Sequence, residues 1–233
     1  FKSYLSYGTI LFVDPYDFGT VRLESIKTFT NIYYCELLWN VFTSDFIRNI
    51  NNDLNNVRLI NCLGTEIKSC KTTEDVIDYI RKCLISGNIK YSFSYSFKIL
   101  TNRELYQIMF FTPKILGLEK LKDALWEVFS GKEFHRNHFD DPNQLCLLTD
   151  ETDKDMCLNE YKSKAQKMLM DYLKQNNKKL TFNELETFIL ENSMLQKGHI
   201  LKHEIKPLIN AGVLIKLDLN GKKVFPIMTH EGS

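Results

Sequence analysis

The sequence has no long apolar run and no strong charge of either sign. No stretch approaches the roughly 18 consecutive apolar residues that a membrane-spanning helix needs. The net charge is +1, so no overall field points to a nucleic acid or a membrane surface as a partner. With 44% hydrophobic and 25% charged residues, the composition is that of a globular protein, and we expect no membrane association.

Paired cysteine motifs are also missing. The six cysteines form no CxxC pair and have no histidine at metal-ligand spacing; they are Cys35, Cys62, Cys70, Cys83, Cys146 and Cys157. In a chain of 233 residues this argues against both a structural zinc site and a disulfide scaffold. We therefore expect reduced cysteines in a cytoplasmic protein.

The beginning of the chain lacks a methionine and a signal-peptide pattern. It starts at Phe1, without the basic start, apolar middle and small-residue exit of a secretory leader. We expect that further residues precede Phe1.

The first 130 residues alternate between strand and helix patterns. Residues 9–13 form a short apolar run that predicts a strand buried on both faces, and residues 21–29 predict a short helix. Residues 32–42 are almost continuously apolar and predict a second buried strand, followed by a helix over 44–54. Strand, helix, strand and helix in this order indicate a parallel sheet with crossover helices.

Further along, an amphipathic helix is predicted over 73–86 and an alternating strand over 91–100. The next strand, from 105 to 112, would pair with it as an antiparallel hairpin at one edge of the sheet. A second amphipathic helix over 116–129 places five apolar residues on one face, namely Leu118, Leu121, Leu125, Val128 and Phe129. The predicted fold class is α/β, with a partial Rossmann sheet.

Periodicity is lost after residue 130, where Gly, His, Asn, Asp and Thr gather. We interpret residues 131–157 as a linker between a domain over 1–130 and a second domain over 158–233. No internal repeat or low-complexity tract is present.

The second domain has the element order of a winged helix-turn-helix. A helix begins near Leu158, and Thr181 and Glu184 have the spacing of a capping box that opens the next helix. A third helix is expected over 198–210, kinked or split by Pro207 and ended by Gly212. Asn220-Gly221 then supplies the turn of a β-hairpin.

The segment "ILFVDPYDFG", residues 10–19, is the first candidate site. Ligands of open α/β sheets sit at the carboxyl ends of the strands, where Asp14 and Pro15 would lie. Asp14 could accept a hydrogen bond or proton from a substrate amine or hydroxyl, while Tyr16 or Phe18 stacks on a flat substrate such as a nucleobase. The alternative is a strand-terminating Asx turn without a ligand.

The segment "HRNHFDD" brings together residue types that bind metals, with His135, His138, Asp140 and Asp141 within seven positions. Their spacing fits no known ligand motif. We favour a solvated interdomain loop over a metal site, and we expect no metal.

The winged helix could bind nucleic acid through basic residues of its third helix and wing, which are Lys197, His199, Lys202, His203, Lys206, Lys222 and Lys223. From Leu158 onward there are 12 lysines, 8 acidic residues and no arginine, which gives +4 for this region. The missing arginines count against base readout. Winged helices also dock proteins, and both uses remain open.

The residues of the first domain resemble the C-terminal half of the three-Cys-motif partner proteins, which are bacterial proteins with a class I methyltransferase-like Rossmann fold. The matching stretches are "ILFVDPYDFGTVRLESIKTF", "ELLWNVFTSDFIRNI" and "LYQIMFFTPKILGLEKLKDALWEVFSG". The resemblance implies that Asp14 and Pro15 match a strand-end Asp-Pro-Phe-Gly motif and that Arg48 matches a substrate-side helix arginine. It also implies a winged helix over residues 158–228.

Two departures from the family pattern concern chemistry. "DPYDFG" inserts residues into the motif and lacks the second proline that orients an exocyclic amine in amino-methylating enzymes. No glycine-rich loop follows a first strand, so the half that would hold S-adenosylmethionine is absent from this chain.

The resemblance leaves two hypotheses. In one, the chain is part of a SAM-dependent methyltransferase-like protein that acts on nucleic acid or a nucleic-acid-associated partner. In the other, it is a non-catalytic scaffold or docking subunit of a bacterial defence or mobile-element system, whose winged helix binds DNA or a partner protein. The family name implies a radical-SAM-like three-Cys-motif partner.

Overall fold

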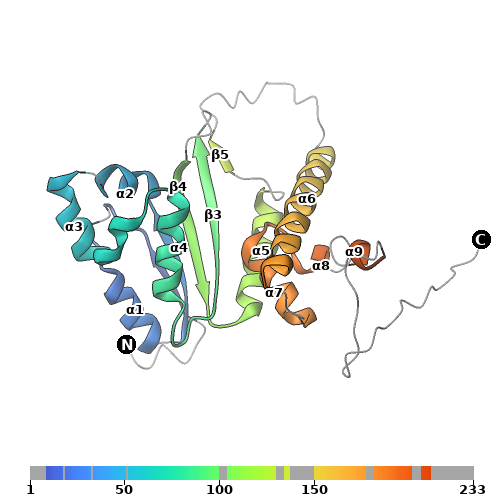
Figure 1. Cartoon of the computed structure of the whole chain (residues 1–233), viewed down its shortest axis with the longest axis horizontal. Coiled ribbons are helices and arrows are strands. Elements are labelled where there is room, and N and C mark those ends of the chain that lie inside the picture. Colours follow the sequence, from blue (N-terminus) through green and yellow to red (C-terminus); the bar gives the residue numbers. More distant parts are fainter. Residues whose placement is uncertain are drawn as a thin grey trace, which may run out of the picture. The chain divides into compact units, whose positions relative to one another are not determined.

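A computed structural model describes residues 9–17, 19–32, 34–50, 52–99, 104–129, 134–136, 150–176, 181–200 and 206–210. The chain divides into two compact units, residues 1–154 and 155–233. The first unit holds a sheet with helices on both sides, and the described part of the second is helical (Figure 1). No helix in these ranges is long and apolar enough to cross a membrane.

The sheet of the first unit is mixed and has the strand order β1-β2-β4-β3-β5. Its strands are β1 (Thr9–Val13), β2 (Cys35–Val41), β3 (Tyr91–Ile99), β4 (Glu104–Thr112) and β5 (Phe134–Arg136). β1 and β2 are parallel, β4 is antiparallel to both β2 and β3, and β5 is parallel to β3. The α/β class, the parallel β1–β2 pair and the antiparallel β3–β4 hairpin are thereby confirmed.

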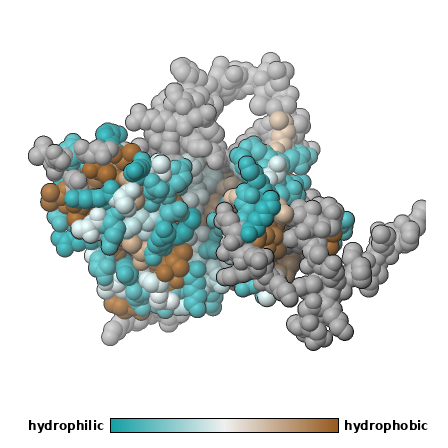
Figure 2. Space-filling view, in the orientation of Figure 1, coloured by the Kyte–Doolittle hydropathy of each residue, from teal (hydrophilic) through white to brown (hydrophobic). Residues whose placement is uncertain are grey.

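Helices cover the two faces of this sheet unequally. One face carries α1 (Leu23–Ile32), α2 (Thr43–Ile50), α3 (Asp53–Leu63), a 3-10 turn (Thr65–Ser69) and α4 (Thr73–Leu84). The other face carries α5 (Ile115–Phe129), which packs on β3 and β4 (Figure 1). The surface over α1–α4 is mostly hydrophilic, with small hydrophobic patches (Figure 2).

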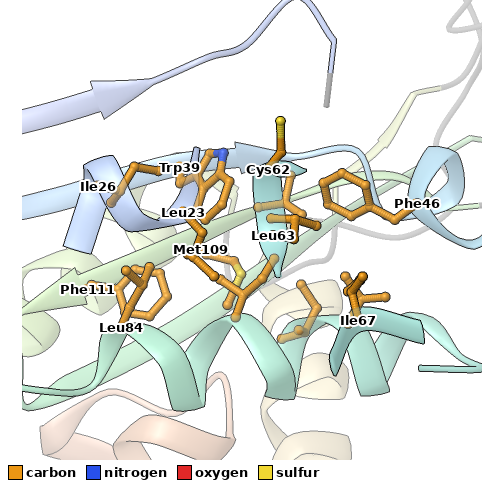
Figure 3. Packing of buried hydrophobic residues seen from close by; sticks show 14 of the residues in the cluster. Leu23, Ile26, Trp39, Phe46, Cys62, Leu63, Ile67, Leu84, Met109 and Phe111 are labelled. Atoms are coloured by element: carbon orange, nitrogen blue, oxygen red, sulfur yellow. The ribbon is translucent and has the colours of Figure 1, made fainter. Parts of the chain in front are cut away.

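The main apolar core lies between the sheet and α1–α4 (Figure 3). Alternate residues of β2 point to this side, and the register places Leu37 beside Phe111 and Trp39 beside Met109. All four side chains are at most 2% exposed. The period of two in each strand therefore sends one set of apolar residues into a closed core.

The second unit contains α6 (Asp150–Asn176) from Asp155 onward, together with α7 (Phe182–Asn192), α8 (Lys197–His199) and α9 (Lys206–Asn210). The predicted capping box is confirmed, because the backbone N–H of Glu184 donates to Thr181 Oγ1 and the Thr181 N–H donates to Glu184 Oε2. The predicted terminal hairpin and the stop at Gly212 lie outside the described residues, so the winged helix stays a prediction.

The prediction that β1 is buried on both faces was wrong. Ile10 is 59% and Phe12 60% exposed, whereas Leu11 and Val13 pack partly against the core. In the described part of the chain β1 pairs with β2 alone, and α5 covers β3 and β4 instead. An apolar run cannot reveal whether a neighbouring helix exists to cover it.

Several element boundaries also differ from the prediction. The helix expected over 44–54 is two helices, α2 and α3, and α6 begins at Asp150 rather than near Leu158. β5 lies within the segment predicted to be a linker. The buried face of α5 includes Lys122 and Trp126, while Val128 is 69% exposed.

Candidate functional site

The carboxyl ends of β1 and β2 bring together Asp14 and Asn40. The two strands are parallel and in register, with Val13 beside Trp39, so their carboxyl ends lie side by side. We call this end of the sheet its carboxyl edge. The Nδ2 amide of Asn40 donates a hydrogen bond of 2.8 Å to Asp14 Oδ1. Asp14, which directly follows β1, is exposed at this edge.

Asn40 has a second polar atom that makes no hydrogen bond. A carboxylate only accepts hydrogen bonds, so the amide nitrogen faces Asp14 and the amide oxygen faces away from it. That oxygen is buried and accepts no hydrogen bond. Sequence reasoning missed Asn40, although one polar residue inside the apolar run "LLWNVF" was the signal.

The turn after Asp14 is built by Asp17. The Gly19 N–H donates to Asp17 Oδ1 at 2.5 Å, and the Thr20 N–H donates to the Asp17 backbone oxygen. The Asx turn therefore exists, but it uses Asp17 and leaves Asp14 to Asn40. Tyr16 between them is 98% exposed and contributes nothing to the core. Phe18 lies outside the described residues.

Helix α3 holds this turn from the side. Arg58 Nη2 lies 3.0 Å from Asp17 Oδ2, and the Cys62 thiol donates to the Gly19 carbonyl oxygen at 3.3 Å. The Gly19 N–H and the Arg58 guanidinium hold the pKa of Asp17 below its usual value. Burial raises the pKa of the Cys62 thiol, which keeps it protonated as a donor.

Arg48, the second residue of the predicted substrate site, makes a local contact. Its Nη2 lies 3.0 Å from Asp45 Oδ1, three residues earlier on α2, and its side chain is 64% exposed. This is the usual i, i+3 ion pair of a helix surface. The structure places Arg48 in that pair and gives no contact between it and Asp14.

An aromatic pair lies at the same edge of the sheet. Phe42 follows β2, and Tyr106 is near the start of β4, which runs in the opposite direction. Their ring centroids are 5.8 Å apart and the rings are tilted by 58°. Because both rings are partly exposed, this pair offers an aromatic surface that sequence reasoning did not identify.

A buried lysine lies elsewhere in the first unit. Lys122 of α5 is fully buried, and its Nζ is 2.9 Å from the centroid of the Phe93 ring. Burial lowers its pKa well below the ordinary value of a lysine. Phe93 is near the amino end of β3, so Lys122 lies away from the edge that holds Asp14.

The predicted nucleic-acid residues are described only in part. Lys197 Nζ lies 3.8 Å from Glu186 Oε2, and His199 Nδ1 accepts from the Gln196 N–H at 3.3 Å. Lys206 is exposed. The other four, Lys202, His203, Lys222 and Lys223, lie outside the described residues.

The residues at the strand edge do not by themselves fit S-adenosylmethionine. Gly19 is the one described glycine in the turn after β1, and a Cβ atom there would lie 2.6 Å from Arg58 Nη2. The space beside this glycine is occupied by a guanidinium, so it is no open cradle for a ligand. Within the described ranges, no group of three metal-binding side chains was found either.

No family model, curated protein or solved structure matches the chain.

Proposed function

We propose that the first unit is the substrate-binding part of a methyltransferase-like domain, with Asp14 and Asn40 as its polar pair. The observation that carries this proposal is their hydrogen bond at the carboxyl ends of two parallel strands. Asp14 would accept a hydrogen bond from an amine or hydroxyl of the substrate, and Pro15 would keep the turn rigid.

The strand directions support the same proposal. β1, β2 and β3 run in one direction, and β4 is inserted in the opposite direction between β2 and β3. A sheet of parallel strands that contains, among those described, a single antiparallel strand, β4, is compatible with the methyltransferase-like fold that the resemblance implies. The methyl donor would be S-adenosylmethionine, held by residues other than those at this edge.

The decisive experiment measures cofactor binding and turnover separately. Calorimetry with S-adenosylmethionine tests binding by the protein, and methyl transfer to DNA, RNA and protein tests activity. Asp14→Ala should abolish methyl transfer and leave cofactor binding unchanged, whereas Asp45→Ala, a partly exposed carboxylate on α2, should retain both. Absence of cofactor binding by the folded full-length protein, with any residues that precede Phe1 included, would refute the enzymatic proposal.

The alternative function, a non-catalytic docking subunit, is supported by the exposed side chains of β1. Ile10 and Phe12 present apolar surface on a strand that carries no charged residue. A protein partner would explain this surface without catalysis. If Asp14→Ala and Asn40→Ala leave every activity unchanged while Phe12→Glu abolishes partner binding, the docking function replaces the enzymatic one.

Nucleic-acid binding by the second unit is a separate part of the proposal. The exposed Lys206 should contribute more than Lys197, whose charge is partly neutralised by Glu186. We expect affinity for DNA or RNA to fall steeply with salt, and to fall further with Lys202→Glu and Lys206→Glu than with Lys197→Glu. Anisotropy titrations at two salt concentrations measure this, and an affinity that ignores salt excludes it.

A further inference from the structure

The turn after β1 is fastened at two places that are distant in sequence. At one end, Asn40 of β2 donates to Asp14 across 26 residues. At the other end, α3 contacts Asp17 and Gly19 through Arg58 and Cys62, across 41 and 43 residues. Tyr16 projects into solvent between these two attachments.

The contacts from α3 form one connected unit. Arg58 Nη2 reaches both carboxylate oxygens of Asp17, at 3.1 and 3.0 Å. Asp17 in turn accepts from the Gly19 N–H, and the Gly19 carbonyl accepts from the Cys62 thiol. Each member of the chain Arg58, Asp17, Gly19 and Cys62 therefore contacts the next, and release of one loosens the others.

Gly19 makes the approach of Arg58 feasible. A Cβ atom at this position would lie 2.6 Å from Arg58 Nη2 and 2.9 Å from Nε. The guanidinium therefore lies directly against the backbone of the turn, a placement that a side chain would obstruct. The glycine at the end of "DPYDFG" serves this contact with α3.

The ion pair is half exposed, with side-chain exposures of 54% for Arg58 and 36% for Asp17. Such pairs contribute little to global stability because water screens them. The Arg58–Asp17 pair therefore adds little to the stability of the fold. It can hold the turn in one conformation and also allow the turn to open locally.

We propose that Arg58 and Cys62 are positioning residues, which hold the turn through Asp17 and Gly19 so that Asp14 stays at the carboxyl edge of the sheet against Asn40. Loss of the Arg58–Asp17 pair would release the turn, uncover the Cys62 thiol and disturb the Asp14–Asn40 hydrogen bond. We call the contacts among Arg58, Asp17, Gly19 and Cys62 the latch. The consequence for a substrate rests on the proposed function, whereas the latch can be tested without any ligand.

The first test is thiol accessibility, with a control inside the same protein. Cys62 and Cys70 are both 6% exposed, and the Cys70 thiol contacts Asp75 rather than the turn. The full chain is alkylated with iodoacetamide, and each cysteine is quantified by peptide mass spectrometry. We expect Arg58→Ala and Asp17→Asn to accelerate alkylation of Cys62 about threefold to tenfold, with Cys70 unchanged.

Matched variants distinguish loss of the latch from a general loosening of the fold. Arg48→Ala removes an ion pair of similar exposure on α2 and should leave both thiols unchanged. Arg58→Lys keeps the charge and should restore part of the protection, and the double variant of Asp17→Asn with Arg58→Ala should react no faster than either single variant. Equal acceleration at Cys62 and Cys70, or none at Cys62, would overturn the proposal.

The second test reports on Asp14 itself. The side-chain amide protons of Asn40 give an NMR signal that depends on the hydrogen bond to Asp14, and Asp14→Ala identifies the signal of the broken bond. Arg58→Ala should shift the Asn40 signal toward that position, and Arg48→Ala should not. An unshifted signal would contradict a positioning role. If both tests support the latch but the full-length protein, with any residues that precede Phe1, binds no cofactor, the methyltransferase proposal alone is refuted.

Discussion

The two faces of the sheet are built from the same strands but are closed by different means. On the side of α1–α4, alternate residues of β2 and β4 join four helices in a continuous apolar core. On the other side, α5 alone among the described helices covers β3 and β4, through contacts of aromatic rings and of the Lys122 amine. Ile10 and Phe12 of β1 are exposed on this side. Alternation assigns each residue to a face, but covering elements decide which residues are buried.

The largest difference should be seen between two phenylalanines on opposite faces. Phe111 is fully buried in the core, and Phe12 is 60% exposed. Phe111→Ala should lower the free energy of unfolding by about 3–5 kcal/mol, because it leaves a cavity that its neighbours cannot fill. Phe12→Ala should change it by less than about 0.5 kcal/mol. Urea denaturation followed by circular dichroism compares the two, and similar losses would contradict the asymmetry.

The contact of α5 with the sheet should be sensitive to added volume. A Cβ at Gly117 would lie 2.1 Å from Glu36 Oε1 and 2.4 Å from Thr112 Oγ1, two side chains that hydrogen-bond to each other. Gly117→Ala should therefore destabilise the first unit by about 1–3 kcal/mol.

Gly198→Ala is the control for this substitution, since nothing lies within 4 Å of a Cβ there. Thermal denaturation of both variants would test the prediction. A gain in stability for Gly117→Ala would mean that α5 lies farther from the sheet than described.

Because Lys122 of α5 is buried, we expect the free energy of unfolding to depend on pH. Lys122→Met should raise the free energy of unfolding by about 1–2 kcal/mol at pH 7. Methionine has a side chain of similar length, and the substitution removes the buried amine. Burial lowers the pKa of Lys122 well below 10.5, so between its folded and unfolded values the unfolded chain holds the additional proton and wild-type stability rises with pH.

The advantage of Lys122→Met is therefore largest below the folded pKa of the lysine and shrinks as the pH rises toward 10.5. Urea denaturation at a series of pH values measures this trend. Lys120→Met, which removes a lysine 71% exposed on the same helix, is the control for the loss of a lysine. An advantage of Lys122→Met that grows with pH would contradict the assigned direction of the shift.

The smallest effect on stability is expected at the exposed side of β1. Ile10→Lys should change the free energy of unfolding by less than about 0.5 kcal/mol, since the side chain is already 59% exposed. Leu11→Lys, one position along, points to the partly closed core side and should cost several times more. Denaturation of both variants measures how different the two faces are within a single strand.

Much of the first unit could be predicted from local patterns. The period of two in 91–99 and 104–112 indicated the antiparallel hairpin, and the strand–helix–strand order at 9–41 indicated the parallel pair. In the second unit, the capping box at Thr181 could likewise be predicted from four consecutive residues. These features depend on neighbours in sequence, which is why sequence reasoning found them.

The candidate site was predicted less completely. Asp14 could be placed at a strand end from the residues around it, whereas its partner Asn40 is 26 residues away. Arg48 was chosen by resemblance, and the structure pairs it with Asp45 on its own helix. Arg58 has no local feature that distinguishes it from any helix arginine, so its contact with Asp17 could not be foreseen.

The sequence by itself therefore determined which residues form strands and helices and which end of β1 carries the acidic turn, because backbone periodicity and capping are local. Only the tertiary structure decided that Asn40 meets Asp14, that Arg58 lies against Gly19, that Lys122 is buried and that Ile10 and Phe12 are not. These outcomes depend on how the helices are placed over the two faces of the sheet, and the same local pattern is compatible with either placement.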